Sequence, residues 1–470
     1  MIGTNRALLA CLLLLGAFGG CNGNIDDTRL LIAVTERVSL DSSGNESFGN
    51  SSNPSISADG RYVAFDSIAV TLVPGDTNAS SDVFRKDTVL GTMVRVSVEA
   101  AGTGAFPNGP DGAADGENAN GTSIRPSISA DGRFVAFQSD ATDLITDTPK
   151  PAGQFDIYVR DLQLNTTALV SVPTAGTFAN GPSANPAVSP DGRFVAFESV
   201  ATNLSADVVS GAQNHVFVWD RNSNTCELVS KHTSGAVGNG VHQLPAVSQV
   251  GSNGANGVFV VFQSTSGNLV TGAGAAGIFH VFRKAIPAGA AEMADAVNVG
   301  LVPSDGPSQT PAITPDGRFV VFRSAGTNLA ANDINGADDI FLRDFSIAPP
   351  GLLTLVSTSV SGVPGSAGSS LPAISADGRY VAFLSLAQNL VPSDANIGQD
   401  AFWKDLQSNA PESIRIVNVS TFGHQGIGIG SVRPSITADG RRVAFVYGFA
   451  DLVNGDTNGS NDILTNGPLH

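Results

Sequence analysis

The sequence predicts an all-β fold, a seven-bladed β-propeller of four-stranded blades. One phrase is written seven times at spacings of about 60–70 residues, each repeat holds four short apolar segments, and aromatic residues recur at two matched positions per repeat. A helical period of 3.6 residues does not occur after the first twenty residues. Four-stranded sheets that need cover on both faces obtain it by packing radially around an axis, as propeller blades do.

The repeated phrase marks the start of each blade. Its first copy reads Pro54-Ser-Ile-Ser-Ala-Asp-Gly-Arg-Tyr-Val-Ala-Phe65. One degraded copy, Pro245–Phe262, replaces the Asp-Gly-Arg turn with the longer segment Gln249–Gly257. The other copies are Pro126–Phe137, Pro186–Phe197, Pro311–Phe322, Pro372–Phe383 and Pro434–Phe445. In the well-preserved copies the Asp-Gly pair supplies the tight turn of a hairpin.

The first repeat shows which strands are expected. Ser55–Ser57 is a brief first strand. Tyr62–Phe65 is an unbroken apolar run, as expected of a strand that is buried on both faces. Asp82–Arg85 is the third strand, and Val94–Val98 alternates between apolar and polar residues, as an outer strand does.

The matched aromatic positions predict the hydrophobic core. One position lies in the second strand of each repeat and the other in the third, and burying each ring contributes roughly 1.5–3 kcal/mol. The pairs are Phe65/Phe84, Phe137/Tyr158, Phe197/Phe217, Phe262/Phe282, Phe322/Phe341, Phe383/Phe402 and Phe445/Leu464.

The seventh repeat lacks a fourth strand, and the segment before the first repeat can supply it. Thr35–Leu40 resembles the fourth strand Met93–Val98 of the first repeat. We expect Thr35–Leu40 to complete the seventh blade, which closes the ring and removes two open sheet edges. Burial of Val34, Val38 and Leu40, together with the hydrogen bonds of the strand, would offset the entropic cost of closure.

The composition argues against a nucleic-acid partner. The chain has a formal net charge of −17, from 42 acidic and 25 basic residues. Binding to phosphate backbones requires clustered Lys and Arg, which an acidic chain of this kind does not offer. Charged residues make up 14% of the chain, and glycine, at 53 residues, is abundant, which is typical of an exported β-protein.

The N-terminal residues resemble a bacterial export signal. Arg6 precedes the apolar stretch Ala7–Phe18, which is too short to span a bilayer, and two small residues then lead to Cys21. The junction resembles a lipobox, in which Cys21 would be lipidated, although Phe18 stands where Leu is preferred. Ordinary cleavage near the same point is the alternative.

These features predict the domain organisation and the location of the chain. Residues 1–21 are expected to be a signal peptide that ends at Cys21, residues 22–30 a linker, and residues 31–470 the propeller. The protein would be exported to the periplasm or the outer membrane as a lipoprotein, or otherwise be secreted. Its only contact with a membrane would then be the lipid anchor.

The repeated phrase resembles a known family. Ser-Ala/Pro-Asp-Gly-Arg-aromatic-Val-Ala-Phe, followed by Asp-Val/Ile-Phe/Tyr and Arg/Lys-Asp, is similar to the TolB-type (WD-like) propeller repeat from about Thr35 onward. The resemblance implies a bacterial envelope propeller that is often used for protein–protein contact. Seven repeats stand here in place of six, and no room remains for a separate N-terminal α/β domain. No Gly-x-Ser-x-Gly elbow of a serine hydrolase occurs.

Four loops between the second and third strands share the pattern Asp-x-Asn-x-x-x-Asp. Alternating oxygen ligands of this kind can wrap Ca²⁺, although the pattern does not establish a cofactor. The residues are Asp76, Asn78 and Asp82; Asp333, Asn335 and Asp339; Asp394, Asn396 and Asp400; and Asp456, Asn458 and Asp462. The bidentate Glu of a strong calcium loop is absent. The alternative is an Asx-type turn, in which side-chain oxygens accept backbone N–H groups.

Three histidines suggest a second possible site. His215 and His280 occupy the position of Asp82 in the third and fourth repeats, with His242 in the adjacent inter-blade loop. Together they could hold a metal, as in certain propeller lyases, so a metal-dependent lyase or hydrolase is the alternative function. Otherwise histidine simply replaces aspartate at the start of a strand. The favoured function is a non-enzymatic monomeric scaffold that binds a protein or another envelope component through its loop-rich face.

Overall fold

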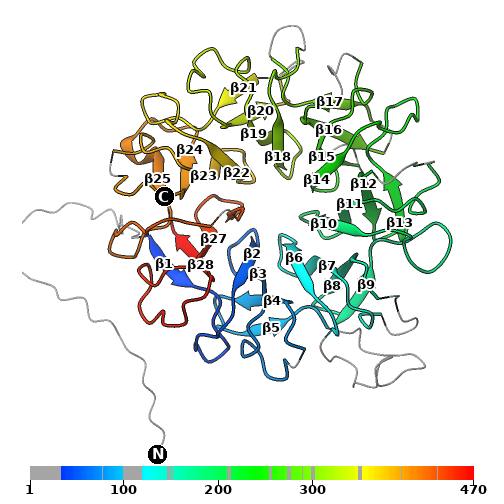
Figure 1. Cartoon of the computed structure of the whole chain (residues 1–470), viewed down its shortest axis with the longest axis horizontal. Helices are drawn as coiled ribbons and strands as arrows, with labels where there is room; N and C mark the ends of the chain where they lie inside the picture. The colour runs from blue at the N-terminus through cyan, green and yellow to red at the C-terminus, as the bar shows by residue number, and fades with distance from the viewer. Residues whose placement is uncertain are drawn as a thin grey trace, which may run out of the picture. The chain divides into compact units, whose positions relative to one another are not determined.

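The chain forms a ring of seven four-stranded antiparallel sheets around one axis, which confirms the all-β seven-bladed propeller (Figure 1). The structure is a computed structural model that describes residues 33–469 except 77, 99–118, 146–149, 151, 208, 210–212, 253, 255–256, 272–276, 288, 298–301, 348–351, 393 and 431. The expected signal peptide at residues 1–21, Cys21 and the linker at residues 22–30 lie outside the described residues. Within the described part, the single helical element is the 3₁₀ turn η1 (Pro411–Ser413), and no helix there could cross a bilayer.

The blades follow the order of the repeats. Blade one contains β2 (Ser51–Ile56), β3 (Tyr62–Ser67), β4 (Asp82–Asp87) and β5 (Met93–Arg95). Blade two contains β6 (Ser123–Ile128), β7 (Phe134–Ser139), β8 (Asp156–Asp161) and β9 (Thr166–Leu169). Blade three contains β10 (Ser183–Val188), β11 (Phe194–Ser199), β12 (His215–Asp220) and β13 (Thr225–Leu228). Blade four contains β14 (His242–Val247), β15 (Val258–Ser264), β16 (His280–Ile286) and β17 (Ala291–Met293).

The last three blades complete the ring. Blade five contains β18 (Ser308–Ile313), β19 (Phe319–Ser324), β20 (Asp339–Asp344) and β21 (Leu352–Leu355). Blade six contains β22 (Ser369–Ile374), β23 (Tyr380–Ser385), β24 (Asp400–Asp405) and β25 (Ile414–Ile416). Blade seven contains β26 (Ser435–Ile436), β27 (Val443–Tyr447), β28 (Asp462–Gly467) and, as its outer strand, β1 (Val34–Arg37).

The first strand of blade one begins four residues before the position that the sequence predicts. The expectation of Ser55–Ser57 was wrong, since β2 covers Ser51–Ile56. The repeated proline is accommodated by a bulge, because the residue before it, Asn53, takes a left-handed φ of 51° and the pairing register shifts there. The strand therefore continues upstream of a proline that would otherwise mark its start.

The matched aromatic residues pack against each other as predicted. Phe65 on β3 and Phe84 on β4 are register partners whose ring centroids lie 6.0 Å apart, and both side chains are fully buried. Six of the seven pairs make such a ring contact, at 5.7–6.0 Å. In blade seven Leu464 takes the second position opposite Phe445. The core is therefore repeated once per blade.

Cationic side chains on the third strands tie each of several blades to the blade before it. The Nζ atom of Lys404 on β24 donates to the carbonyl oxygens of Val356 at 2.8 Å and Thr358 at 2.6 Å, both in blade five. Arg343 on β20 makes the same kind of contact through its Nε atom, at 2.7 Å from the carbonyl oxygen of Ala294 in blade four. These charge-assisted bonds satisfy carbonyls at the ends of outer strands, where no further strand can do so.

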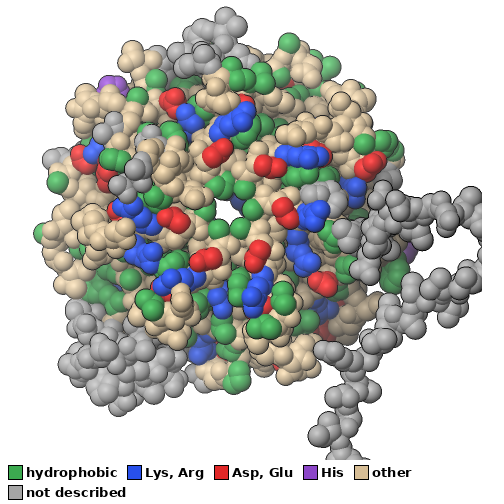
Figure 2. Space-filling model, turned by 180° about the vertical axis from the view of Figure 1, so that it is seen from behind, with side chains coloured by type: hydrophobic (Ala, Val, Ile, Leu, Met, Phe, Trp, Pro, Cys, Tyr) green, Lys and Arg blue, Asp and Glu red, His purple; other side chains and the backbone are tan. Residues whose placement is uncertain are grey.

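Main-chain hydrogen bonds also join neighbouring blades around the axis, at the turn between the first and second strands. The N–H to C=O pairs are Ala58 to Ala130, Ala130 to Pro190, Gln249 to Pro315, Ala376 to Ala438 and Ala438 to Ala58, at 2.8–3.0 Å. On the same turns the arginine of the repeated phrase pairs with the aspartate that ends the third strand, as Arg61 does with Asp87 at 2.7 Å. Figure 2 shows acidic and basic side chains gathered around the axial hole on this side.

The N-terminal strand closes the ring as predicted. β1 pairs antiparallel with β28, from Val34 opposite Gly467 to Arg37 opposite Leu464. Beyond β1 the N–H of Val38 donates to Ile463 at 2.8 Å. The expected burial of Val34 was wrong, because its side chain is 36% exposed. Side chains alternate along a strand, and Thr35 rather than Val34 points inward.

The predicted burial of the other two apolar residues of this segment is confirmed for one of them only. Val38 is buried as predicted, whereas Leu40 is half-buried. Thr35 accepts a hydrogen bond from Nδ2 of Asn466 at 2.6 Å, so part of the closure is polar. The Ser39 hydroxyl donates to Asp462 at 2.5 Å and extends the contact past the strand.

We expect removal of the closing strand to leave an open ring. A chain that begins at Asp41 should melt roughly 10 °C or more below a chain that begins at Ile32, because it loses one strand and exposes two sheet edges. Differential scanning calorimetry of the two chains measures the difference, and size-exclusion chromatography should show edge-driven association of the shorter one. Equal melting temperatures would show that the closing strand does not stabilise the ring.

Candidate functional site

The loops that carry the predicted site residues all lie on one face of the ring. In an antiparallel blade the connection between the second and third strands lies on the same side as the connection to the next blade. We call this side the loop face. The tight turns of the repeated phrase lie on the opposite side, which is ringed by charged pairs (Figure 2).

The asparagine of the Asp-x-Asn loops forms an Asx turn in all four blades. Its Oδ1 atom accepts the N–H of the residue two positions later, at 2.6–2.8 Å. Its Nδ2 atom donates to a carbonyl of the following inter-blade loop, at 2.6–2.9 Å. The residues are Asn78, Asn335, Asn396 and Asn458. The amide thus clamps two loops together, and its oxygen is occupied by a backbone donor.

The two aspartates of each loop come close to each other, and in blade seven a cation compensates them. The Nη2 atom of Arg37 on β1 lies 3.8 Å from a carboxylate oxygen of Asp456. The Nε atom of the same side chain lies 3.6 Å from a carboxylate oxygen of Asp462. In blade one, Arg95 occupies the equivalent position of the repeat and its charge acts on Asp82. Burial nevertheless dominates there and raises the pKa of Asp82 to about 6.

In blade six a side-chain amide donates hydrogen bonds to both carboxylates of the aspartate pair, and in blade two an ammonium group lies beside the corresponding aspartate. The Nε2 atom of Gln425 donates to Asp394 at 2.8 Å and to Asp400 at 2.9 Å. In blade two, where the Asp-x-Asn pattern is missing, Nζ of Lys150 lies 3.2 Å from Asp156, the aspartate that begins the third strand. Sequence reasoning missed these compensating residues. The recurrence of Arg37 and Arg95 at one repeat position was the available signal.

Blade five differs, because no cationic side chain in the described part of the chain pairs with Asp333 or Asp339. Asp339 accepts hydrogen bonds from Ser357 and from Asn335, the latter at 2.8 Å. Asp333 is 9% exposed, and its Oδ1 atom has no hydrogen-bond partner. Burial and then the charge of Asp339 raise the pKa of Asp333 to about 6. The pair therefore combines two facing carboxylates, an oxygen without a hydrogen-bond partner and no cationic partner, which is an arrangement that a bound cation would stabilise.

The three histidines do not gather around one point. His215 begins β12, and its ring stacks on that of His242 with centroids 5.1 Å apart. His280 begins β16 and instead places Nδ1 at 2.8 Å from Asp295. The expectation that His242 lies in an inter-blade loop was wrong, since it begins β14. The described residues contain no group of three or more His, Cys, Asp or Glu side chains arranged to hold a metal.

His242 is an anomaly within the repeat. Five other blades place serine at this position, each bonded to a serine of the second strand at 2.8–3.0 Å; these are Ser51, Ser123, Ser183, Ser308 and Ser369. His242 is fully buried, and neither ring nitrogen has a hydrogen-bond partner. Burial, followed by the neighbouring His215, lowers the pKa of His242 to about 3. The imidazole is therefore neutral at physiological pH.

Exposed apolar side chains gather on the loop face over blades six, seven and one. We call these residues the apolar seam: Ile397 (86% exposed), Phe422 (83%), Phe48 (74%), Ile427 (60%) and Phe449 (48%). On the loop face of blades two and three, the described residues include no exposed large apolar side chain. Blades four and five also expose single apolar side chains on this face, among them Ile334 (85%) and Val302 (50%), so the apolar seam is the part of a wider apolar region in which the loops of neighbouring blades touch.

Close backbone packing makes the centre of the apolar seam continuous. A Cβ atom at Gly398, next to Ile397, would lie 2.5 Å from the carbonyl oxygen of Ile427, so only glycine permits these loops to touch. The N–H of Ile427 donates to the hydroxyl of Tyr447 at 3.0 Å, and the Tyr447 ring lies 5.7 Å from that of Phe449. Loops of blades six and seven thus present one surface.

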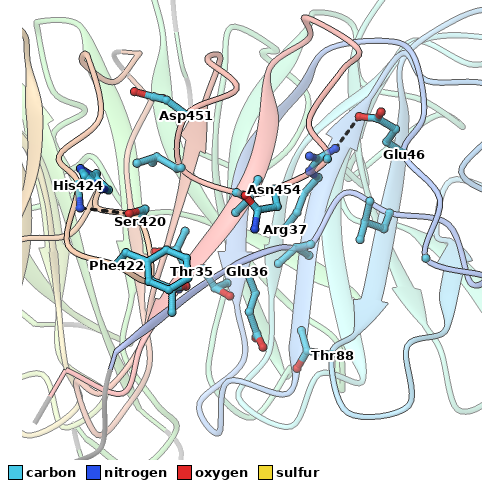
Figure 3. Close-up of a pocket in the computed structure, with 18 of the residues that line it drawn as sticks. Thr35, Glu36, Arg37, Glu46, Thr88, Ser420, Phe422, His424, Asp451 and Asn454 are labelled. Atoms are coloured by element: carbon cyan, nitrogen blue, oxygen red, sulfur yellow. Dashed lines mark hydrogen bonds and ion pairs between the residues drawn. The ribbon is translucent and has the colours of Figure 1, made fainter. Parts of the chain in front are cut away.

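A cavity of about 800 Å³ lies beside the apolar seam, at the closure of the ring (Figure 3). It is lined by β1, by the loop between blades six and seven with Phe422, and by the loop of blade seven that contains Asp451. Glu46 lies at one edge, 2.7 Å from Arg37. Hydrogen bonds from Thr457, and then the contact with Arg37, lower the pKa of Glu46 to about 2, so this edge keeps an ionised pair.

Comparison with known proteins finds similarity of fold only. No model of a known protein family matches the chain, and no curated protein matches its sequence. An oligogalacturonate lyase in complex with manganese is 9% identical, with a TM-score of 0.49 over 93% of this chain and 90% of that one. TolB from Acinetobacter baumannii is 14% identical, with a TM-score of 0.36 over 89% of this chain and 63% of that one. A puromycin-hydrolyzing peptidase of Mycobacterium tuberculosis is 13% identical, with a TM-score of 0.47 over 88% and 53%.

We expect calcium, if it binds the Asp-x-Asn loops, to act through blade five. Millimolar CaCl₂ should raise the melting temperature by on the order of 1–3 °C, and Asp333→Asn should abolish the rise because it removes one of the two facing charges. Asp394→Asn is the matched control, since Gln425 already bridges the carboxylates of blade six. MgCl₂ at equal ionic strength controls for salt. If the wild-type chain shows no calcium-specific rise, these loops act as Asx turns alone.

Acid should destabilise the ring through His242. Its pKa lies below the unfolded value of about 6.5, so the unfolded chain binds the proton more readily and stability falls as the pH drops from about 6.5 toward 3. His242→Ser should remove up to roughly 2–3 kcal/mol of the stability lost between pH 7 and pH 4.5. Urea denaturation at both pH values measures this, with the exposed His424→Ser as control. An undiminished acid loss in His242→Ser would contradict the assignment.

Proposed function

We propose that this chain is an exported, non-enzymatic propeller that binds a protein component of the cell envelope through the loop face. The proposal rests on one observation, the apolar seam over blades six, seven and one. Large apolar side chains that are exposed together, with polar residues around them, are typical of protein-binding surfaces. Four of the five residues of the seam are aromatic or long aliphatic side chains more than half exposed.

The cavity at the ring closure adds a recess to this surface. Phe422 projects beside it, and the Arg37–Glu46 pair lies at its edge (Figure 3). An apolar anchor residue of a partner can fill such a recess while charged groups at the rim exclude water and set the orientation. The combination favours a folded protein or a structured peptide over a small apolar molecule.

Export is part of the proposal and is supported by the sequence. Arg6, the apolar stretch Ala7–Phe18 and Cys21 have the order of a signal peptide that ends at a lipidated cysteine. The resemblance to the TolB-type repeat points in the same direction. A lipid anchor would hold the ring at a membrane surface and leave the loop face available to a partner.

The metal-dependent lyase or hydrolase remains the alternative, and the geometry favours it less. His215 in blade three contacts His242 in blade four, whereas His280 contacts Asp295 within blade four, so the three histidines do not share one site. A catalytic metal requires ligands that converge on one point and leave one position open. Binding through the apolar seam requires no such arrangement.

Site-specific crosslinking in cells tests the proposal. A photoreactive amino acid at Ile427 should give a discrete adduct with an envelope protein, and Ile397→Glu should reduce that adduct about tenfold by placing a charge in the contact. Leu90 is the matched control, because its side chain is 67% exposed on the opposite side of the ring.

The outcome distinguishes specific binding from non-specific crosslinking. Docking predicts an adduct from position 427 and none from position 90. Equal labelling from both positions, or an adduct that Ile397→Glu leaves unchanged, would show that the apolar seam is not the binding surface. Circular dichroism of the purified variants confirms that the ring is intact.

A further inference from the structure

The four Asp-x-Asn loops contain the same aspartate pair, but the side chains that face the pair differ between blades. In blade seven the guanidinium of Arg37 lies within 3.8 Å of both carboxylates. In blade six the amide of Gln425 donates to both, and in blade one the charge of Arg95 acts on Asp82. Two positions of the repeat therefore supply the facing group, one in the outer strand and one in the following inter-blade loop.

Blade five has no such group at the outer-strand position. Leu355 on β21 lies opposite Phe341 of the third strand, as Arg37 on β1 lies opposite Leu464 in blade seven. The register thus places an aliphatic side chain where blade seven has a guanidinium. The loop between β19 and β20, residues 325–338, contains no Lys or Arg either, so it offers no counterpart of the blade-two ammonium group.

The inter-blade position of blade five also lacks a donor, because Pro364 stands there in place of Gln425. The two positions are equivalent in the structure, since the next residue, Gly365 or Gly426, accepts a hydrogen bond at 2.7 Å from Nδ2 of the loop asparagine in both blades. A proline side chain has no hydrogen to donate. Both positions that face the aspartate pair in other blades are therefore unable to do so in blade five.

One oxygen of the blade-five pair is left without a partner. The side chain of Asp333 is 9% exposed, and its Oδ1 atom has no hydrogen-bond partner among the described residues. The charges of the buried Asp339 and of Asp305 act on it. Arg323 on β19 pairs with Asp338 instead, at 3.0 Å. A buried carboxylate oxygen is costly unless a donor or a cation faces it, so this arrangement indicates a cation ligand.

We propose that blade five binds one calcium ion between Asp333 and Asp339, and that the other three Asp-x-Asn loops bind none because a cationic or amide group of the protein already faces their aspartates. Ca²⁺ takes six to eight oxygen ligands, and water completes the shell around the carboxylates. Two carboxylates give a weak site, with a Kd on the order of 0.1–1 mM.

The ion would act on the loop face of blade five. Ile334 lies between the two aspartates in the sequence, and its side chain is 85% exposed. An ion that joins Asp333 to Asp339 therefore fixes the loop that presents this side chain. The calcium site does not depend on the protein partner proposed for the apolar seam.

Equilibrium dialysis of the full chain against radioactive CaCl₂ tests the proposal by counting bound ions. The wild type should bind one ion per chain, and an equal concentration of MgCl₂ should not displace it, because Mg²⁺ loses its water less readily. Asp333→Asn should weaken binding at least about tenfold, since it removes one of the two charges. Asp394→Asn is the matched control: it changes the same loop position in blade six, where Gln425 bridges the carboxylates, and should keep the single ion.

Two exchange variants test the facing residue itself. Pro364→Gln gives blade five the donor of blade six and removes no carboxylate, so it should abolish calcium binding. Gln425→Leu removes that donor from blade six, so the chain should bind a second ion. A gain of binding cannot result from loss of folding, and circular dichroism checks that the ring is intact in the variants that lose the ion.

Four outcomes would overturn the proposal. They are a wild-type chain that binds no calcium, a wild-type chain that binds one ion in each Asp-x-Asn loop, full affinity in both Asp333→Asn and Pro364→Gln, and no second ion in Gln425→Leu.

Discussion

The pairing of β1 with β28 is the contact on which the rest of the molecule depends. A radial stack of sheets is stable only when the last sheet packs against the first, and here the outer strand of blade seven comes from the other end of the folded chain. The same strand carries Arg37, which compensates the aspartates of blade seven and holds Glu46. The strand that closes the ring therefore also forms the edge of the candidate binding surface.

Repetition made the architecture predictable from the sequence. A run such as Tyr62–Phe65 has one physical explanation, a strand buried on both faces, and its recurrence removed the ambiguity of a single short apolar run. The prediction failed where local chemistry runs against a general rule. Proline normally ends or begins a strand, and a left-handed Asn53 lets β2 continue past it. Val34 was expected to be buried because it is apolar, and the alternation of side chains turns it outward.

The site was less predictable because its properties arise between loops of different blades. The loops that contain Asp333 and Asp394 share one pattern, yet their environments differ. The difference comes from the next inter-blade loop, where Gln425 reaches the blade-six pair and Pro364 stands at the corresponding place in blade five. Proline has no donor to offer. Such differences between the partners of the aspartate pairs can be recognised only when the repeats are compared position by position in the known structure.

The main-chain bonds around the axis divide the ring unequally. Pro190 in blade three and Pro315 in blade five each accept a bond from a neighbouring blade, but a proline nitrogen carries no hydrogen to pass the connection on. Blades four and five thus form a pair linked by Gln249, and the other five form a second linked arc. At these two contacts the blades are joined nearer the loop face instead, by the main-chain bonds from His242 to Asn214 and from Ser369 to Asp338, so their inner turns are free to separate without breaking a main-chain bond between them.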